Sequence, residues 1–206
     1  MAQINQSIKI PGSVTQAWRE AAVFGALWGA AEMTLGSFLS ATRIPLVGIF
    51  MACLGVALMT SGYILVERRW FPLKAALVCA ALRALAPQGL IINPMIAIVL
   101  QGAVISVVFL LIRNRLWSGV IAGFLVVLSS LSQAVIVKLF VYGATLWELY
   151  SAFLTRIENI FGLHTGQGWL IVGIFIALIG LLGALAGILG WRLGRTALKQ
   201  KGKLLE

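Results

Sequence analysis

The sequence has no aspartate and few acidic residues of any kind. Only six of its 206 residues are acidic, whereas 16 are lysine or arginine, which gives a formal net charge of +10. Charged residues make up 11% of the chain, against roughly 25% in soluble domains. A water-soluble surface cannot be built from so few charges when 61% of the residues are hydrophobic. The composition therefore indicates a multi-pass protein, which we expect in the inner (cytoplasmic) membrane of the cell.

Residue types that carry most enzymatic and metal chemistry are also scarce. The chain has a single histidine, His164, and two cysteines, Cys53 and Cys79, which stand in apolar segments without CxxC spacing. It has no Walker A sequence, no HExxH motif and no Cys/His set at metal-ligand spacing. We therefore expect no enzymatic activity, no cofactor and no metal. We also expect no nucleic-acid partner, because lysine and arginine flank membrane spans and set their orientation.

What the sequence does contain is a series of long apolar segments. A helix needs about 20 apolar residues to cross the hydrocarbon of a bilayer. The run from Phe71 to Ile112 is too long for one span, and a Pro-Gln-Gly and an Asn-Pro interrupt it near its middle. Divided there, the chain has six predicted spans: Ala21–Ala41, Ile44–Val66, Phe71–Ala86, Pro94–Ile112, Ser118–Val141 and Leu170–Gly190. We predict an all-α membrane protein with six transmembrane helices in a single domain, residues 1–206.

The basic residues predict which way the spans face, because they are unequally divided between the two sides. Twelve lie on one side: Lys9, Arg19, Arg68, Arg69, Lys74, Arg113, Arg115, Arg192, Arg195, Lys199, Lys201 and Lys203. Four lie on the other: Arg43, Arg83, Lys138 and Arg156. Cytoplasmic loops carry the excess of lysine and arginine, so both chain ends are predicted to be cytoplasmic. Residues 1–17 then form a cytoplasmic tail, 18–191 the six-helix bundle, and 192–206 a basic tail that favours anionic membrane lipids.

Polar residues gather in the segments predicted to lie at the outer face. The stretch LRALAPQGLIINPMIA, residues 82–97, forms an outer hairpin in which Arg83, Gln88 and Asn93 stand among apolar residues. An arginine facing lipid is costly, so Arg83 either points into the bundle or extends outward to water. With Arg43 from the first outer loop, these residues are predicted to line a pocket. Guanidinium groups favour a ligand with a carboxylate, phosphate or other electron-rich oxygen. The alternative is a plain tight turn.

The third outer segment, from Tyr142 to Gly168, is long for a connection between spans. Apolar residues recur in it at helical spacing, while Glu148 and Asn159 stand on the opposite face. We predict an amphipathic helix between the fifth and sixth spans. It either lies at the membrane surface or covers the pocket as a lid, in which case Glu148 and Asn159 contribute to substrate binding.

The first span carries a stripe of small residues and one acid. The stripe consists of Ala22, Gly25, Ala26, Gly29 and Ala30. Such a smooth face lets another helix approach closely, either within the chain or from another subunit. Span six has a similar stripe in Gly173, Gly180, Gly183 and Gly187. Glu32 is the only acidic residue deep in a predicted span, and a buried carboxylate in a membrane is a functional candidate. Most of the further polar residues in the spans are interpreted as interhelical hydrogen bonding: Gln101, the cluster of Ser129, Ser130, Ser132 and Gln133, and Lys138.

Two stretches, FGALWGAAEMTLGSFLSATRIPLVG (24–48) and ALRALAPQGLIINPMIAIVLQGAVISVV (81–108), together with the layout of six spans, resemble the S components of energy-coupling factor (ECF) transporters. These small membrane proteins bind a vitamin, a related cofactor precursor or a metal ion. The resemblance implies that the stripe on the first span docks on a transmembrane coupling subunit, that two cytoplasmic ATPases supply the energy, and that a small-molecule substrate binds near the outer face.

The chain departs from the known members of this family in its ligand motifs. It has no signature for thiamine, riboflavin, biotin, folate or cobalamin, and the N-terminal histidine motif of nickel and cobalt members is missing. The substrate therefore stays open. Two other functions also stay open: a membrane assembly subunit that binds no solute, and an ion-coupled carrier that uses Glu32. An internal inverted repeat would favour the carrier, and the two halves differ in the placement of their helix breakers.

Overall fold

The structure, a computed structural model, describes residues 14–42, 46–85, 92–143 and 168–203, together with 148, 150–152 and 155–156. Every described element is a helix. The helices are α1 (Val14–Ala31), the π-helix η1 (Glu32–Gly36), α2 (Ser37–Ala41), α3 (Val47–Val66), α4 (Phe71–Ala84), α5 (Ile92–Leu111), α6 (Arg115–Tyr142) and α8 (Gly168–Lys203). The predicted all-α fold is thus confirmed for this part of the chain.

Five helical segments are long and apolar enough to cross a membrane. They are Val14–Leu39, which runs through α1 and η1 into α2, and then Val47–Val66, Ile92–Leu111, Arg115–Phe140 and Gly168–Lys203. The protein is therefore a multi-pass membrane protein. The remaining predicted span forms α4, which has 14 residues. At 1.5 Å per residue, α4 is about 21 Å long, shorter than the hydrocarbon thickness of about 30 Å.

The helices extend beyond the predicted spans at both chain ends. Helix α1 begins at Val14, inside the segment predicted as an N-terminal tail, and α8 continues to Lys203, through most of the predicted basic tail. The parts of α1 and α8 that lie outside the predicted spans contain no proline, and a helix tolerates glycine. The ladder of backbone hydrogen bonds therefore continues past the apolar stretch. Apolar length predicts where a helix crosses the membrane, and it does not predict where that helix ends.

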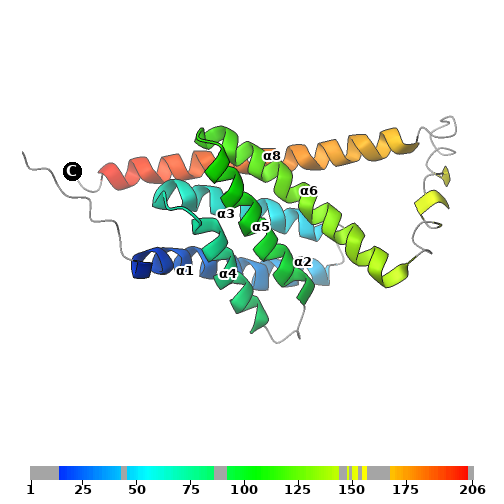
Figure 1. The fold of residues 1–206 in the computed structure, drawn as a ribbon, viewed down its shortest axis with the longest axis horizontal. Coiled ribbons are helices and arrows are strands. Elements are labelled where there is room, and N and C mark those ends of the chain that lie inside the picture. Colours follow the sequence, from blue (N-terminus) through cyan, green and yellow to red (C-terminus); the bar gives the residue numbers. More distant parts are fainter. Residues whose placement is uncertain are drawn as a thin grey trace, which may run out of the picture.

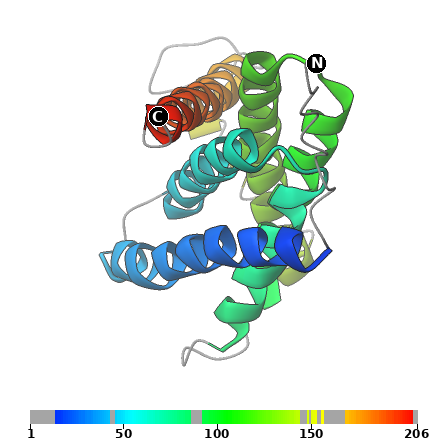
Figure 2. The same cartoon turned by 90° about the vertical axis from the view of Figure 1, so that its left-hand side faces the viewer.

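Helix α3 lies at the centre of the bundle and contacts α1, α4, α5, α6 and α8. Helices α1, α3 and α8 follow one another on one side of the molecule, while α4, α5 and α6 run along the other side (Figures 1 and 2). The most extensive contacts are those of α6 and α3 with α8, followed by the contacts of α4 with α5 and α1. The fully buried side chains include Trp28, Met59 and Phe71, which fill the space between α1, α3 and α4.

Glycines allow several of these helices to pack backbone to backbone. A Cβ atom on Gly187 would collide with the carbonyl oxygen of Gly119, and one on Gly183 with that of Gly123. We call these four residues of α6 and α8 the glycine crossing. Further along α8, a Cβ on Gly190 would lie 2.6 Å from the carbonyl oxygen of Ala57 in α3. Close approach of this kind is how helices associate in lipid, where no hydrophobic force drives them together.

The two ends of the bundle differ in charge. The first turns of α1 and the last turns of α8 lie at the same end (Figure 1), which also carries the short α3–α4 and α5–α6 connections. Basic residues there contact neighbouring groups: Arg68 Nε pairs with Glu20 Oε2 at 2.9 Å, Lys74 lies over Trp18, and Arg115 lies over Tyr63. We call this the basic end. The last turns of α4, the first turns of α5 and the second half of α6 lie away from this end (Figure 1).

Candidate ligand-binding site

A cavity of about 290 Å³ opens near the end of the bundle opposite the basic end. Five elements meet there: η1, the first turns of α3, the last turns of α4, the first half of α5 and the second half of α6. Its polar lining residues are Glu32, Arg83, Asn93, Gln101, Ser130 and Gln133. Its apolar lining residues include Val47, Met51, Pro94, Ala97, Ile98 and Ala134. Apolar walls with a few convergent polar groups are typical of small-molecule sites, and this volume is near their lower limit of about 300 Å³.

Arg83 connects α4 to the first span at this cavity. Its Nη1 donates a hydrogen bond of 3.1 Å to the backbone carbonyl of Glu32, the first residue of the π-helix η1. A π-turn departs from the regular helical ladder, and such turns occur frequently at functional sites. The side chain of Arg83 is half-buried and lines the cavity. Arg83 therefore points into the bundle, as one of the two predicted alternatives requires.

The Glu32 carboxylate lines the same cavity and is 9% exposed. A Cβ atom on Gly36, one turn later, would lie 3.6 Å from Glu32 Oε2, which is an ordinary van der Waals distance, so this carboxylate lies beside Gly36. The Arg83 guanidinium interacts electrostatically with Glu32, although no ion pair within 4.0 Å joins the two among the described residues. The indole of Trp28 is also near and fully buried, and its N–H has no acceptor at hydrogen-bond geometry in the part of the chain that the structure describes.

The opposite wall is formed by amide and hydroxyl groups of α5 and α6. Gln133 Nε2 donates to Asn93 Oδ1 at 2.8 Å and to the Asn93 backbone carbonyl at 3.0 Å. Deeper in the wall, Gln101 Nε2 donates to Ser130 Oγ at 3.3 Å. Gln101 is 6% exposed, and among the described residues its Oε1 atom is buried without a hydrogen-bond partner. Because a buried acceptor without a partner costs about 1–3 kcal/mol, a small turn of this amide that brings Oε1 to a donor on a bound molecule would be stabilising.

No family model, curated protein or solved structure matches this chain. What the cavity binds must therefore be inferred from the chemistry of its own walls.

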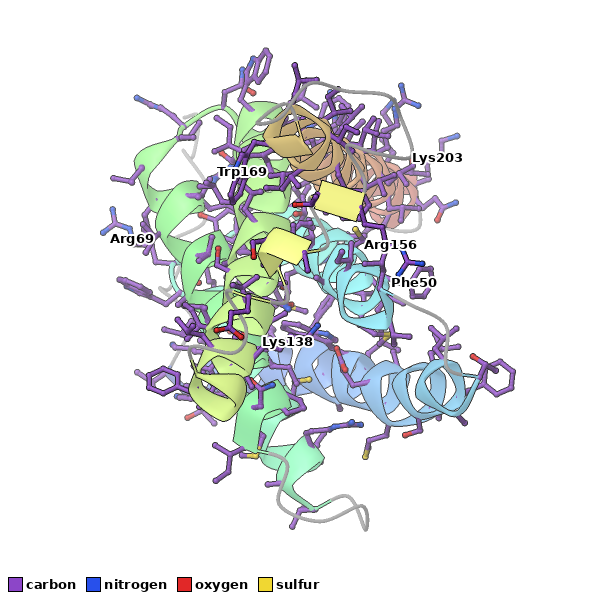
Figure 3. The ribbon with its side chains drawn as sticks, turned by 90° about the vertical axis from the view of Figure 1, so that its right-hand side faces the viewer. Phe50, Arg69, Lys138, Arg156, Trp169 and Lys203 are labelled. Carbon is purple, nitrogen blue, oxygen red and sulfur yellow. The ribbon has the colours of Figure 1, made fainter. Side chains whose placement is uncertain are left out.

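The structure brings some of the predicted site residues together and separates others from them. Arg83, Asn93 and Glu32 meet in the wall of one cavity. Arg43, Gln88 and Asn159 lie outside the described residues, as does most of the predicted amphipathic helix. Glu148 is exposed and does not line this cavity. Figure 3 looks along the bundle from the cavity's end, with Lys138 of α6 near the centre of the view.

Three lining residues, Gln101, Ser130 and Gln133, were predicted only to hydrogen-bond between helices. Gln101 and Ser130 do form such a bond, and they also face the cavity. A signal for the second role was present in the sequence. Asn93, Ala97 and Gln101 recur every four residues, which places them on one face of a helix, and all three line the cavity.

The stripe of small residues on α1 divides into two faces. Gly25 and Gly29 face α4 inside the bundle, because a Cβ on Gly25 would lie 2.5 Å from the Ala75 carbonyl oxygen and one on Gly29 would lie 3.2 Å from Leu82 Cδ1. The alanines of the stripe are exposed: Ala22, Ala26 and Ala30. Among the described residues, the glycines thus serve internal packing, and the alanines are the part of the stripe that another subunit can reach.

Proposed function

We propose that this protein is a substrate-binding S component of an ECF-type importer. It captures a small solute of the vitamin or cofactor-precursor class at the outer face of the cytoplasmic membrane. A transmembrane coupling subunit, driven by two ATPases, then releases the solute inside. The observation that carries the proposal is the cavity, at which four helical elements of an otherwise apolar bundle (η1, α4, α5 and α6) contribute six polar lining residues.

The charge of the two ends supports an outward-facing cavity. The basic end gathers the first turns of α1, Arg68, Arg69 and Arg113 in the short connections, and Arg115 at the start of α6, and the last turns of α8 add further lysines and arginines. Cytoplasmic connections carry such an excess. In the proposed topology both chain ends are cytoplasmic, and the cavity at the other end faces outward.

The short helix α4 completes the proposed set of six spans. It packs between α1 and α5, and its residues Ala75, Ala76 and Cys79 are fully buried. A helix enclosed by longer neighbours does not need to match the bilayer thickness by itself, because local thinning and flanking residues absorb the mismatch. Its short length also sets its last turn, with Arg83, at the depth of the cavity instead of at the outer surface.

A cavity-filling substitution tests whether the site holds a solute. In Ala97→Trp the indole occupies the cavity, so we expect the purified protein to lose the small molecule that co-purifies with the wild type. Ile96→Trp is the matched control, because Ile96 is the preceding residue of α5 and is 55% exposed. Native mass spectrometry in detergent measures bound mass in all three proteins. If the wild type carries no small molecule, or if both variants retain it, solute binding at this cavity is wrong.

The exposed alanines test the coupling part of the proposal. Because helices approach closely only where side chains are small, Ala26→Leu is expected to prevent co-purification of the coupling subunit and ATPases from native membranes. The matched control is Ala177→Leu, since Ala177 is an exposed alanine on α8. Both variants should give the same monomer profile in size-exclusion chromatography. A complex that forms equally well with Ala26→Leu would exclude this face as the coupling interface.

An ion-coupled carrier is the second candidate, favoured by the position of Glu32. A carboxylate that is 9% exposed and lines a polar cavity can bind a proton or a cation together with a solute. Reconstitution into liposomes separates the two functions. A carrier accumulates solute when a proton or sodium gradient is imposed on the purified protein alone, whereas an S component needs its coupling subunit and ATPases.

A further inference from the structure

The charges in the cavity wall identify the class of solute. We propose that the solute is zwitterionic, with a protonated nitrogen directed at Glu32 and an anionic oxygen directed at Arg83. This inference rests on the proposed function, since it names the ligand of the same cavity. One carboxylate and one guanidinium line the space, and they are charged groups of opposite sign on two different helical segments.

A ligand with a single charge would bind only one of these groups and would weaken the electrostatic attraction between the two. An anion bound to Arg83 would bring negative charge next to Glu32 in a site of low dielectric, and a cation bound to Glu32 would do the same to Arg83. Buried charges are tolerated only when they are paired and hydrogen-bonded. A ligand that carries both charges satisfies both groups at once.

The guanidinium of Arg83 has donors available for such a ligand. Arginine has five N–H donors in a planar fork. Among the described residues, one of them is used, in the bond from Nη1 to the Glu32 carbonyl. That bond fixes the side chain on the first span and holds it at the cavity. The remaining fork matches a carboxylate or phosphate oxygen pair.

Gln101 favours a donor on the cationic part of the ligand. Its Oε1 is an acceptor that has no partner among the described residues, and it belongs to a residue that is 6% exposed and lines the cavity. An ammonium or protonated ring nitrogen supplies several N–H donors, enough for both the Glu32 carboxylate and the Gln101 carbonyl. A carboxylate or phosphate has no donor to offer at this atom when it is ionised.

This assignment adds a cationic group to the ligand expected from the sequence. Two arginines without a nearby aspartate favoured a ligand that carries a carboxylate, phosphate or other electron-rich oxygen. In the structure, Glu32 lines the same cavity as Arg83, whereas Arg43 lies outside the described residues. Lys138 is one helical turn beyond Ala134 on α6 and is exposed, and it is not part of the lining. The described lining is therefore balanced in charge.

Probes that differ only in charge test the proposal on the full-length protein in detergent. Two zwitterions of different length, γ-aminobutyrate and para-aminomethylbenzoate, are compared with analogues that lack the ammonium group (butyrate, para-methylbenzoate) or the carboxylate (butylamine, para-methylbenzylamine). Dissociation constants are obtained from the probe dependence of thermal unfolding. We expect at least one zwitterion to bind at least about tenfold more tightly than both of its analogues, since unpaired buried charges cost that much or more.

The Glu32→Gln variant tests whether Glu32 causes the preference for the zwitterion over its analogues. The substitution should weaken binding of the preferred zwitterion at least about tenfold and remove its advantage over the anionic analogue, because the cationic nitrogen loses its partner. Glu67→Gln is the matched control, since Glu67 is exposed at the basic end, and it should leave all constants unchanged. A wild type that prefers the anionic analogue, a Glu32→Gln protein with unchanged preference, or a wild type that binds none of the six probes overturns the zwitterionic class.

The results that would overturn the zwitterionic class can be distinguished from results that would overturn the proposed function. The comparison of Ala97→Trp with Ile96→Trp detects a bound solute without any assumption about its charge. A solute can be present in the wild type and Ile96→Trp and lost from Ala97→Trp while the zwitterionic probes bind no more tightly than their analogues. In that case the proposed S-component function stands and the zwitterionic ligand class is rejected.

Discussion

Gly187→Leu is expected to yield no folded protein, and Gly187→Ala a folded protein with a lowered melting temperature, whereas the same two changes at Gly173 should be tolerated. Both glycines are on α8. A Cβ atom on Gly187 would collide with the backbone of α6 at Gly119, while none of the described residues lies within 4 Å of a Cβ on Gly173. Comparing the substitutions at Gly187 with those at Gly173 therefore separates the effect of the contact between α6 and α8 from the effect of replacing a glycine within α8.

The size of the effect follows from which atoms are in the way. At Gly187 the obstacle is a carbonyl oxygen of the neighbouring backbone, which cannot move aside as a side chain does. Overpacking of this kind costs about 1–3 kcal/mol for small additions. Each kcal/mol lowers the melting temperature by about 2–4 °C in a chain of this size. Leucine cannot fit without separating the helices, and the contacts along the rest of the glycine crossing are then lost as well.

Thermal unfolding in detergent, followed by tryptophan fluorescence, compares the wild type with the four variants. At Gly173, alanine should raise the melting temperature slightly, because glycine is about 1 kcal/mol less favourable than alanine in a helix. If Gly187→Ala is as stable as Gly173→Ala, α6 and α8 do not cross as closely as the structure shows.

The positions of the spans could be predicted from the sequence because they depend on local composition. The five helices of spanning length all overlap predicted spans, and the interruption between Ala86 and Pro94 was placed correctly between α4 and α5. The π-helix at Glu32–Gly36 could not be predicted, since the segment EMTLG reads as ordinary helix. The first carbonyl of this wider turn accepts a hydrogen bond from Arg83, which is 51 residues away in the chain.

The direction in which a side chain points was harder to predict than its position along a helix. Periodicity places Gly25 and Ala26 on neighbouring faces of the first span, and only the packing on α4 shows that one is internal and the other exposed. The same holds for the cavity. Asn93 meets Gln133 across 40 residues of sequence, and Gln101 meets Ser130 across 29. Contacts at such separations depend on how the helices cross, which no local pattern contains.

Arg83→Ala is expected to weaken solute binding at least about tenfold in a protein that still folds. The substitution removes the donor fork from the cavity and leaves the Glu32 carboxylate without a neighbouring positive charge. Removing one member of a buried, hydrogen-bonded charge pair costs about 2–5 kcal/mol at interfaces, and 1.4 kcal/mol already corresponds to a factor of ten in affinity. The bond to the Glu32 carbonyl is lost as well, so the π-turn and α4 are no longer joined at this point.

Two further variants separate charge, geometry and folding. Arg113→Ala removes an exposed arginine at the basic end and should not change affinity. Arg83→Lys keeps the positive charge but replaces the planar fork by a single ammonium group, so it should bind more weakly than the wild type and more tightly than Arg83→Ala. The measurement is the dissociation constant for the solute that co-purifies with the wild-type protein, together with the melting temperature of each variant. If Arg83 only extended outward to water, the opposite result would be expected. Arg83→Ala would then change the melting temperature and would bind the solute as tightly as Arg113→Ala does.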